Sequence, residues 1–414
     1  MRSKHMGKLK RYVVFLLLVL FCTGILSGCY DNREIENLAY VIAIGIDQAE
    51  GNNFNLTFQT AVPQAITEGG GEGTDITTFK TDNFLSGLRK SGQYLSRNIN
   101  LSHTKIIVVS EAIAKKGITA FVNGLEKGMQ IRPDIKIVVA AEGAKEYLKS
   151  IQPKLTSNPS RYYELLFKTY ESDFLIPHAQ LNDYLYRSKN NGAQPLAIYT
   201  AQDKNIVENK KPEGGEGGKK DPGGEKKKSG GGSEKGTGGE EEMIMSLSGL
   251  AVFKQDKMVG RLNAREASIF ALMTGAKNIN IDIADPIDSR FKVLSNLKKE
   301  NSSVTTVKIK DGKPVVKIAL DFDINVQAIQ SNTDYDSPQN AAKLNKAYKD
   351  TLQKEIRQLL KKITYEYKSD IFGFGEMAKR NFLTIKDWEK AKWTDVFPET
   401  KYQVTLNSEV INNE

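Results

Sequence analysis

Residues 316–326 read Val-Lys-Ile-Ala-Leu-Asp-Phe-Asp-Ile-Asn-Val, and this stretch sets the fold of the C-terminal part of the chain. Large apolar side chains occupy every second position, which is the period of a strand that buries one face. A strand of this kind belongs to an antiparallel sheet with one face on a core and the other in water. The sequence must therefore supply a cover for the apolar face.

A long amphipathic helix follows this strand and supplies that cover. Its apolar side chains recur every three or four residues, with Lys and Glu between them. They are Leu344, Tyr348, Leu352, Ile356, Leu359, Ile363 and Tyr367. A final strand places Tyr402, Val404, Leu406 and Val410 on one face. We predict that residues 244–414 form an α+β domain with a long helix against a curved, largely antiparallel sheet.

The first half of the chain alternates strand patterns with helix patterns. Strands are predicted at 39–47, 54–58, 105–110 and 134–140. Helices are predicted at 82–98, 111–127, 145–150, 159–170 and 178–187, with Asp82 capping the first. This alternation predicts an N-terminal α/β region at residues 29–201. The whole chain is therefore expected to be a multi-domain α+β protein, with mixed and antiparallel sheets packed by helices.

Residues 202–243 differ in composition from the regions on either side. Residues 212–242 contain twelve glycines and many lysines and glutamates, but no aliphatic or aromatic side chain. Such a stretch cannot bury enough apolar surface to offset the entropy lost on ordering. We predict a disordered linker here. After it, a strand at 247–254 and a capping box at Asn263 and Glu266 open the C-terminal domain.

The N-terminus has the layout of an export signal. Five basic residues precede an apolar run at 12–26, which is typical of a secretory signal peptide. The run ends in Leu26-Ser27-Gly28-Cys29, which resembles the lipobox of bacterial lipoproteins. We predict that residues 1–28 are removed and that Cys29 carries a diacylglycerol thioether and an N-acyl chain such as palmitate. No other cofactor is expected, and an uncleaved anchor helix is the alternative.

Charge and cysteine content exclude several functional classes. The formal net charge is +9, and removal of residues 1–28, with five basic residues and no acid, lowers it to +4. A chain with this charge gives no strong signal for nucleic-acid binding. The two cysteines are Cys22 and Cys29, so the mature chain keeps one of them. It cannot form a disulfide or a cysteine zinc cluster within itself.

Residues that could carry catalysis or bind a metal are sparse. His103 and His178 fall in different elements, and a lone histidine is more often structural than a ligand. Asp282, Asp285 and Asp288 lack the glycine and the terminal glutamate of a calcium loop, so we interpret them as a turn. The sequence contains no nucleophile elbow, phosphate loop or zinc-protease motif. We predict no catalytic residue, no metal site and no enzymatic activity.

Two phenylalanines are the candidate contact surface. Phe372 and Phe374 alternate with Gly373 and Gly375 directly after the long helix. They could form a platform for a ligand or a partner protein. The simpler interpretation, which we favour, is that the glycines end the helix while the rings fill the core.

Several motifs, spread nearly from end to end, resemble one known family. They are 28–35 (GCYDNREI), 44–47 (IGID), 103–111 (HTKIIVVSE), 131–134 (IRPD), 249–254 (GLAVFK), 258–260 (MVG), 370–375 (DIFGFG) and Trp393. Together they are similar to the Ger(x)C family, the C-subunit lipoproteins of spore germinant receptors. Lys127, Gly128 and Arg261 depart from the family pattern, which puts any interface role of these positions in doubt.

The resemblance implies a place and a function. The protein would lie on the outer face of the spore inner membrane, beside an A subunit and a transporter-like B subunit, in a receptor that responds to nutrients. It implies a fold of three small α/β units, two of them within residues 30–200, and a subunit that is not a catalyst. It leaves open which germinant is sensed and whether this subunit binds it.

Two other functional classes are consistent with an exported lipoprotein. A solute-binding lipoprotein of a transporter would need two lobes around a deep polar cleft. A tethered cell-wall hydrolase would need paired acids or a Ser/His site. The dissimilar domains and the long linker fit a solute-binding protein poorly, and no hydrolase site of this kind can be placed in the sequence. The leading hypothesis is therefore a receptor subunit that acts through non-catalytic protein–protein contacts.

Overall fold

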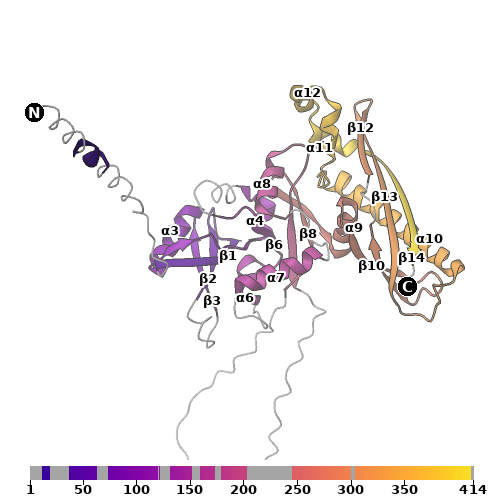
Figure 1. Cartoon of the computed structure of the whole chain (residues 1–414), viewed down its shortest axis with the longest axis horizontal. Helices are drawn as coiled ribbons and strands as arrows, with labels where there is room; N and C mark the ends of the chain where they lie inside the picture. The colour runs from indigo at the N-terminus through magenta and orange to yellow at the C-terminus, as the bar shows by residue number, and fades with distance from the viewer. Residues whose placement is uncertain are drawn as a thin grey trace, which may run out of the picture.

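The computed structural model describes residues 12–18, 37–62, 73–119, 121, 131–151, 159–172, 179–202, 245–299 and 304–411. These residues form two β-sheets with helices packed against them (Figure 1). This architecture confirms the predicted α+β class of mixed sheets covered by helices. The lipobox at 26–29 and nearly all of the predicted linker at 202–243 lie outside the described residues.

The larger sheet has nine strands. Its main path runs through β3 (Thr74–Thr81), β2 (Phe54–Ala61), β1 (Leu38–Gln48), β5 (Ile106–Ser110), β6 (Lys136–Ala140), β7 (Leu196–Gln202), β8 (Met245–Lys254) and β9 (Lys257–Asn263), and β4 (Asn98–Asn100) pairs with β1. The central strands β1, β5, β6 and β7 are parallel, and the outer strands pair antiparallel. Because parallel strands are buried on both faces, β5 and β6 consist almost wholly of apolar residues.

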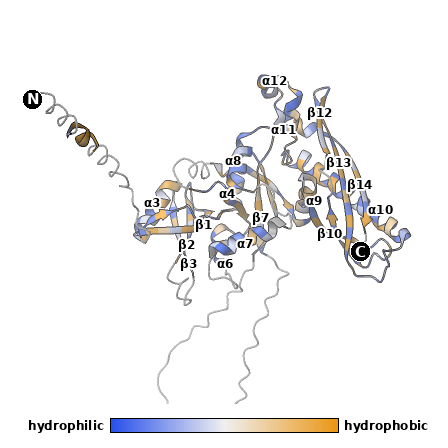
Figure 2. Ribbon diagram, in the orientation of Figure 1, coloured by the Kyte–Doolittle hydropathy of each residue, from blue (hydrophilic) through white to orange (hydrophobic). Residues whose placement is uncertain are grey.

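Helices cover both faces of this sheet. One face packs against α3 (Phe84–Leu95), α4 (Glu111–Lys116) and α8 (Leu181–Lys189). The opposite face packs against α6 (Ala144–Ser150) and α7 (Pro159–Ser172). Figure 2 shows the hydrophobic residues concentrated along the strands and the hydrophilic residues on the outer turns of the helices. Burial of these apolar side chains stabilises the sheet, in which no disulfide can form.

Two local predictions for the helices that cover this sheet are wrong. The cap of α3 is Asn83 and not Asp82, because the Asn83 side chain accepts a hydrogen bond from the Ser86 amide at 2.8 Å. The helix that begins at Glu111 ends at Lys116, whereas the sequence predicted that it reaches residue 127. The reason is Gly117, whose φ of +121° stops the helix.

The larger sheet continues past the predicted domain boundary at residue 244. The sequence assigns the strand at 247–254 to the C-terminal domain, but β8 pairs antiparallel with β7, and β9 then pairs with β8. This pairing covers the edge of β7, which would otherwise be exposed and apolar. The region in which the resemblance implies two separate units also shares this one sheet.

The smaller sheet has five strands. They are β10 (Asn278–Ala284), β11 (Lys292–Lys298), β12 (Val304–Lys310), β13 (Lys313–Ile329) and β14 (Lys401–Ile411). Only β14 runs parallel to its neighbour, β13. The long helix α10 (Pro338–Lys361) packs on this sheet (Figure 1). Its residues Leu344, Tyr348, Leu352, Ile356 and Leu359 are buried, as the sequence predicts.

The helix α9 (Ala264–Thr274) connects the two sheets, and it follows β9 directly without an intervening loop. Asn263, the last residue of β9, forms the predicted capping box with Glu266. One apolar core extends from Leu250 and Leu262 of the larger sheet through α9 to the smaller sheet. The remaining short helices are η2 (Lys362–Glu366), α11 (Phe374–Ala378), η3 (Lys379–Asn381), α12 (Ile385–Lys390), α13 (Trp393–Val396) and η4 (Phe397–Glu399).

Candidate functional site at the junction of the two sheets

The DIFGFG motif lies where the two sheets meet. It follows η2, the π-helical turn that ends α10, and it packs against two segments of the larger sheet. We call residues 187–195, 253–261 and 367–376 the junction. Figure 1 shows its position between α8 and α11.

Main-chain hydrogen bonds hold the junction together. The Gln194 amide donates to the Asp370 carbonyl at 2.8 Å, and the Glu376 amide donates to the Gly192 carbonyl at 3.1 Å. The Ser369 hydroxyl donates to the Phe253 carbonyl at 2.6 Å. Because all of these carbonyls are removed from bulk water, each bond that is lost would leave a polar group unpaired.

Arg187 on α8 adds a charged contact to the same segment. Its Nη1 donates to the Ile371 carbonyl at 3.0 Å and to the Gln194 carbonyl at 3.4 Å. Its Nε lies 2.9 Å from Oδ2 of Asp183, one turn earlier on the helix. The guanidinium therefore bridges the turn that precedes β7 and the DIFGFG motif.

Asp370 lies at the centre of the junction and is almost fully buried. Its Oδ1 accepts from the Phe374 amide at 3.1 Å. Its Oδ2 accepts from the Gly375 amide at 2.8 Å and from the Trp393 indole Nε1 at 2.9 Å. Burial raises the pKa of Asp370 to about 6, against the effect of these donors, which favour the charged form. The carboxyl group thus fixes the shape of the DIFGFG turn.

Two glycines of the quoted motifs are required by close packing. A Cβ at Gly375 would lie 2.5 Å from the indole nitrogen of Trp393 and 2.6 Å from the Gly192 Cα. A Cβ at Gly260 would lie 2.3 Å from the ring of Tyr367. The Tyr367 hydroxyl donates to the Arg261 carbonyl at 2.9 Å. Both glycines therefore let an aromatic ring reach the main chain at the junction.

The two phenylalanines of the motif occupy different environments. Phe374 is 2% exposed and lies within the apolar core. Phe372 is partly buried, with its ring centre 4.8 Å from that of Phe270 and 5.1 Å from that of Phe374. It lines an open pocket of about 580 Å³ together with Arg187, Gly373, Glu376, Met377, Lys379 and Arg380. Contact of either ring with a partner stays a prediction, and Phe372 is the ring that lies at the surface.

A second polar cluster connects α4 to the edge strand β9. The Tyr199 hydroxyl donates to Glu111 at 2.6 Å and accepts from Arg261 at 2.9 Å. The Arg261 guanidinium also lies 5.0 Å from the centre of the Tyr199 ring. Burial, followed by the neighbouring Glu111 carboxylate, raises the pKa of Tyr199 to about 12. Arg261, which departs from the family pattern, thereby stabilises the edge of the larger sheet.

The residues considered for metal binding are placed in structural roles. Both Asp285 oxygens accept hydrogen bonds, Oδ1 from the Ile287 amide and Oδ2 from the Ser331 hydroxyl. His103 packs edge-on against Tyr40, with 5.1 Å between ring centres, and His178 lies outside the described residues. Among the residues that the structure describes, no group of three or more His, Cys, Asp or Glu could hold a metal ion.

Sequence reasoning missed several residues of the junction. Arg187 and Ser369 donate side-chain hydrogen bonds to carbonyls of distant segments, and the Gly192 carbonyl accepts one from a distant amide. No local pattern indicates such contacts. Gly260 and Gly375 belong to the quoted motifs, but the motifs do not indicate the close contacts that require glycine at these positions. The lipobox residues Leu26, Ser27, Gly28 and Cys29 lie outside the described residues. Across the described ranges, no helix combines the length and apolar character that crossing a membrane requires.

The chain matches two family models on either side of the linker. Residues 31–201 match the spore germination protein N-terminal domain, and residues 248–414 match the C-terminal domain described as spore germination B3/GerAC like. Neither model describes a catalytic domain. The match covers both sheets and all three segments of the junction.

Individual relatives agree with this assignment. Spore germination protein KC of Bacillus subtilis (strain 168) is 25% identical over 398 residues, which cover 93% of this chain and 91% of that protein. Spore germination protein GerQC of Bacillus cereus is 20% identical and covers 97% of this chain and 98% of its own length. The crystal structure of the GerBC protein shares the fold, with a TM-score of 0.53, 16% identity and coverage of 89% of this chain and 97% of that chain.

Family models over both halves, full-length relatives and a shared fold agree with the motifs that meet at the junction. The chain belongs to the Ger(x)C family of spore germination proteins.

Proposed function

We propose that this protein is the lipid-anchored C subunit of a nutrient germinant receptor and that it acts through non-catalytic contacts with the A and B subunits. The observation that carries the proposal is the match to spore germination models on both sides of the linker. The junction supports a binding role, because its Arg187, Ser369 and Asp370 side chains are engaged in holding the two sheets together. Its buried carboxylate, Asp370, is engaged by the Trp393 indole and two amides.

The proposed anchor is the lipid on Cys29. A diacylglycerol thioether with an N-acyl chain supplies more than one acyl chain, and two or more chains hold a protein firmly on a bilayer. Export by residues 1–28 places the body of the protein on the outer face of the spore inner membrane. There it would be confined beside its membrane-embedded partners, and its surface would be available for contact with them.

Two cysteine substitutions test this proposal. In Cys29→Ala spores we expect the protein to leave the membrane fraction and the nutrient response to be lost. Cys22→Ala is the matched control, because it removes a thiol seven residues earlier that has no place in the lipobox. We expect that variant to remain on the membrane. Normal membrane retention of the Cys29→Ala protein would show that the anchor is wrong, and a normal nutrient response without the whole protein would refute the receptor role.

A further inference from the structure

The start of α12 displays two aliphatic side chains to solvent. Leu383 is 100% exposed and Ile385 is 67% exposed. Leu383 is the most exposed large apolar side chain of the described residues. We call residues 382–386 the α12 tip. Figure 1 shows α12 at the opposite end of the smaller sheet from the chain's C-terminus.

The α12 tip is an ordered feature. Phe382 packs edge-on against Trp388, with 5.6 Å between ring centres, and Trp388 packs on Trp393 at 6.0 Å. Thr384 caps α12 by accepting a hydrogen bond from the Asp387 amide at 3.2 Å. The two tryptophans beneath the tip are buried, while the two aliphatic side chains are exposed to water.

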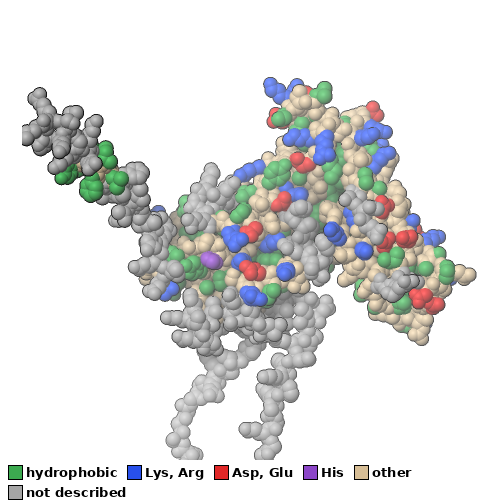
Figure 3. Space-filling view, in the orientation of Figure 1, with side chains coloured by type: hydrophobic (Ala, Val, Ile, Leu, Met, Phe, Trp, Pro, Cys, Tyr) green, Lys and Arg blue, Asp and Glu red, His purple; other side chains and the backbone are tan. Residues whose placement is uncertain are grey.

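Basic side chains flank these apolar ones in the sequence. Residues 379–392 contain five basic and two acidic residues, and all five basic ones are exposed. They are Lys379, Arg380, Lys386, Lys390 and Lys392. One of the acids, Asp387, is engaged by the Thr384 hydroxyl at 2.7 Å. Figure 3 shows Lys and Arg side chains over this end of the molecule with hydrophobic side chains between them.

We propose that the α12 tip inserts into the surface of an anionic phospholipid bilayer. Aliphatic side chains enter the boundary between headgroups and acyl chains, and the surrounding lysines contact anionic headgroups. A projecting pair of side chains suits a soft bilayer better than a protein partner, because a stable protein interface buries about 800 Å² on each side. The inference deepens the proposed function, on which it rests for the presence of a membrane nearby.

The test measures insertion of the tip without the lipid anchor. The mature chain, residues 29–414, carries Cys29→Ala, which removes its one native cysteine, and an environment-sensitive fluorophore is attached at Leu383→Cys. It is mixed with phosphatidylcholine vesicles that contain or lack phosphatidylglycerol. The control carries the label at Lys343→Cys, an exposed site near the start of α10. That end of α10 lies by the chain's C-terminus, because Asn345 donates to the Ser408 carbonyl at 2.9 Å.

We expect a blue shift of the label at position 383 with phosphatidylglycerol vesicles and none at position 343. Lys386→Glu with Lys390→Glu should weaken vesicle binding of the tip by roughly tenfold or more. Ile385→Asp should abolish the shift. Because these side chains are exposed, the variants should keep the parent's thermal unfolding midpoint, which is measured in parallel.

Three outcomes would overturn the proposal. They are no shift at position 383, an equal shift at positions 383 and 343, and an equal shift on vesicles without phosphatidylglycerol. None of these results depends on Cys29, because the tested chain lacks it. Failure of the tip and failure of the proposed lipid anchor are therefore distinguished by separate measurements.

Discussion

Asp370 holds the DIFGFG turn through neutral donors, and its burial sets the energetic cost of that arrangement. The carboxylate accepts hydrogen bonds from the Gly375 amide and the Trp393 indole, so the charged form is partly stabilised. Burial outweighs this effect and raises the pKa of Asp370 to about 6 from an ordinary value of 3.8. The folded protein therefore binds a proton at Asp370 more tightly than the unfolded chain does.

This difference predicts how stability depends on pH. Because the folded-state pKa is raised, Asp370 contributes stability that is fully present below pH 3.8 and is lost as pH rises towards 6. A difference of this size corresponds to up to about 3 kcal/mol of unfolding free energy. Asp370→Asn removes the titration. We expect the unfolding free energy of the wild type, minus that of the variant, to fall between pH 4 and pH 6 in urea titrations.

The comparison with Asp370→Asn isolates one carboxyl group among several. Other acids also contribute to the dependence of stability on pH; the hydrogen bond from Lys292, for example, lowers the pKa of Asp282. Such groups are common to both proteins and cancel in the difference. A difference in unfolding free energy that is constant across this pH range would show that Asp370 titrates normally in the folded protein.

At the residue scale, the sequence predicts which positions are unusual better than it predicts why. Gly260 and Gly375 stand in recognisable motifs, but the reason for each is a ring that arrives from another segment, Tyr367 or Trp393. The alternatives for Phe372 and Phe374 could not be separated from sequence, because both follow from the same glycine-flanked pattern. Tertiary packing assigns one ring to the core and the other to the pocket.

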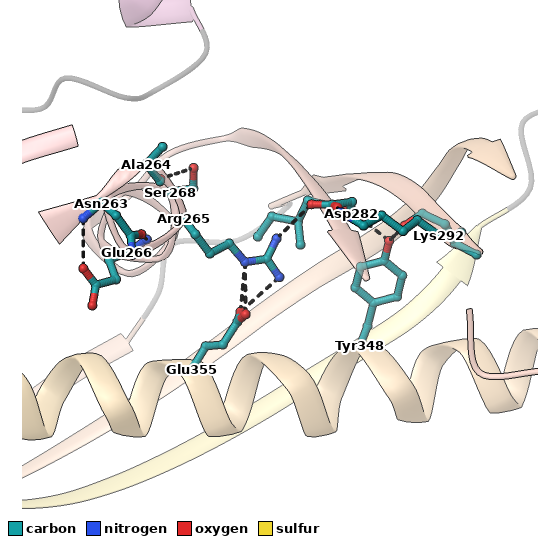
Figure 4. Close-up of polar contacts among 11 residues, drawn as sticks. Asn263, Ala264, Arg265, Glu266, Ser268, Asp282, Lys292, Tyr348 and Glu355 are labelled. Atoms are coloured by element: carbon teal, nitrogen blue, oxygen red, sulfur yellow. Dashed lines mark hydrogen bonds and ion pairs between the residues drawn. The ribbon is translucent and has the colours of Figure 1, made fainter. Parts of the chain in front are cut away.

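At the element scale, two successive charged residues of α9 connect it to α10 and to η2. Arg265 donates to both oxygens of Glu355, with Nε 3.1 Å from each, and lies 3.6 Å from Asp282 on β10 (Figure 4). Glu266 accepts from Lys362 at 2.8 Å. These pairs are partly buried. Since α9 directly follows β9, they hold the smaller sheet in place relative to the larger one.

We predict that the Arg265–Glu355 pair contributes measurably to stability. Bidentate geometry and partial burial favour a stronger contribution than an exposed pair gives. A double-mutant cycle with Arg265→Met and Glu355→Gln should yield a coupling of about 1 kcal/mol in urea unfolding. The coupling should shrink in high salt, because the side chains are not wholly shielded from ions.

Arg290 provides the matched control for this prediction. It also pairs with an aspartate, Asp288, at 2.6 Å, but its side chain is 81% exposed. Arg290→Met should leave the unfolding midpoint unchanged. A coupling near zero for Arg265 and Glu355, equal to that of the exposed pair, would mean that apolar packing alone fastens α9.

Elements with a long, clean period could be predicted from sequence, and several short ones could not. The alternating pattern of β13 and the amphipathic pattern of α10 each persist over many residues, and both are confirmed. The seven-residue strands β7, β10 and β11 were missed, whereas the five-residue strands β5 and β6 were predicted because they are almost wholly apolar. Over so few positions, a buried polar residue such as Ser295 interrupts the apolar period.

At the scale of the whole molecule, the chain leaves the larger sheet at β7 and returns to it at β8. Seven residue pairs join these two strands. The pairing joins segments that are distant in sequence and depends on burial of both faces of β7. Composition alone therefore indicates the linker but not the pairing of the strands on either side of it. The sequence therefore predicts where the chain changes character. It cannot predict that the next strand extends the sheet already formed.

This topology predicts that the linker can be cut without separating the two parts. A site for a specific protease, inserted between residues 230 and 231, would divide the chain into one piece ending in β7 and another beginning with β8. The pieces would stay bound through the β7–β8 ladder, the Arg187 contact with the Ile371 carbonyl and the shared apolar core. We expect them to elute together with the uncut protein in gel filtration, and apart in denaturant.

The alternative is that the two parts are separate domains that a tether holds near each other. Cleavage would then release them, because a tether raises only the effective concentration of weak contacts. Two native peaks after cleavage would therefore contradict the continuous sheet. A variant with Gly260→Trp, which clashes with Tyr367 across the junction, should release the pieces even if the cut wild type does not. The side chain at 260 would thus report whether the junction stabilises the association.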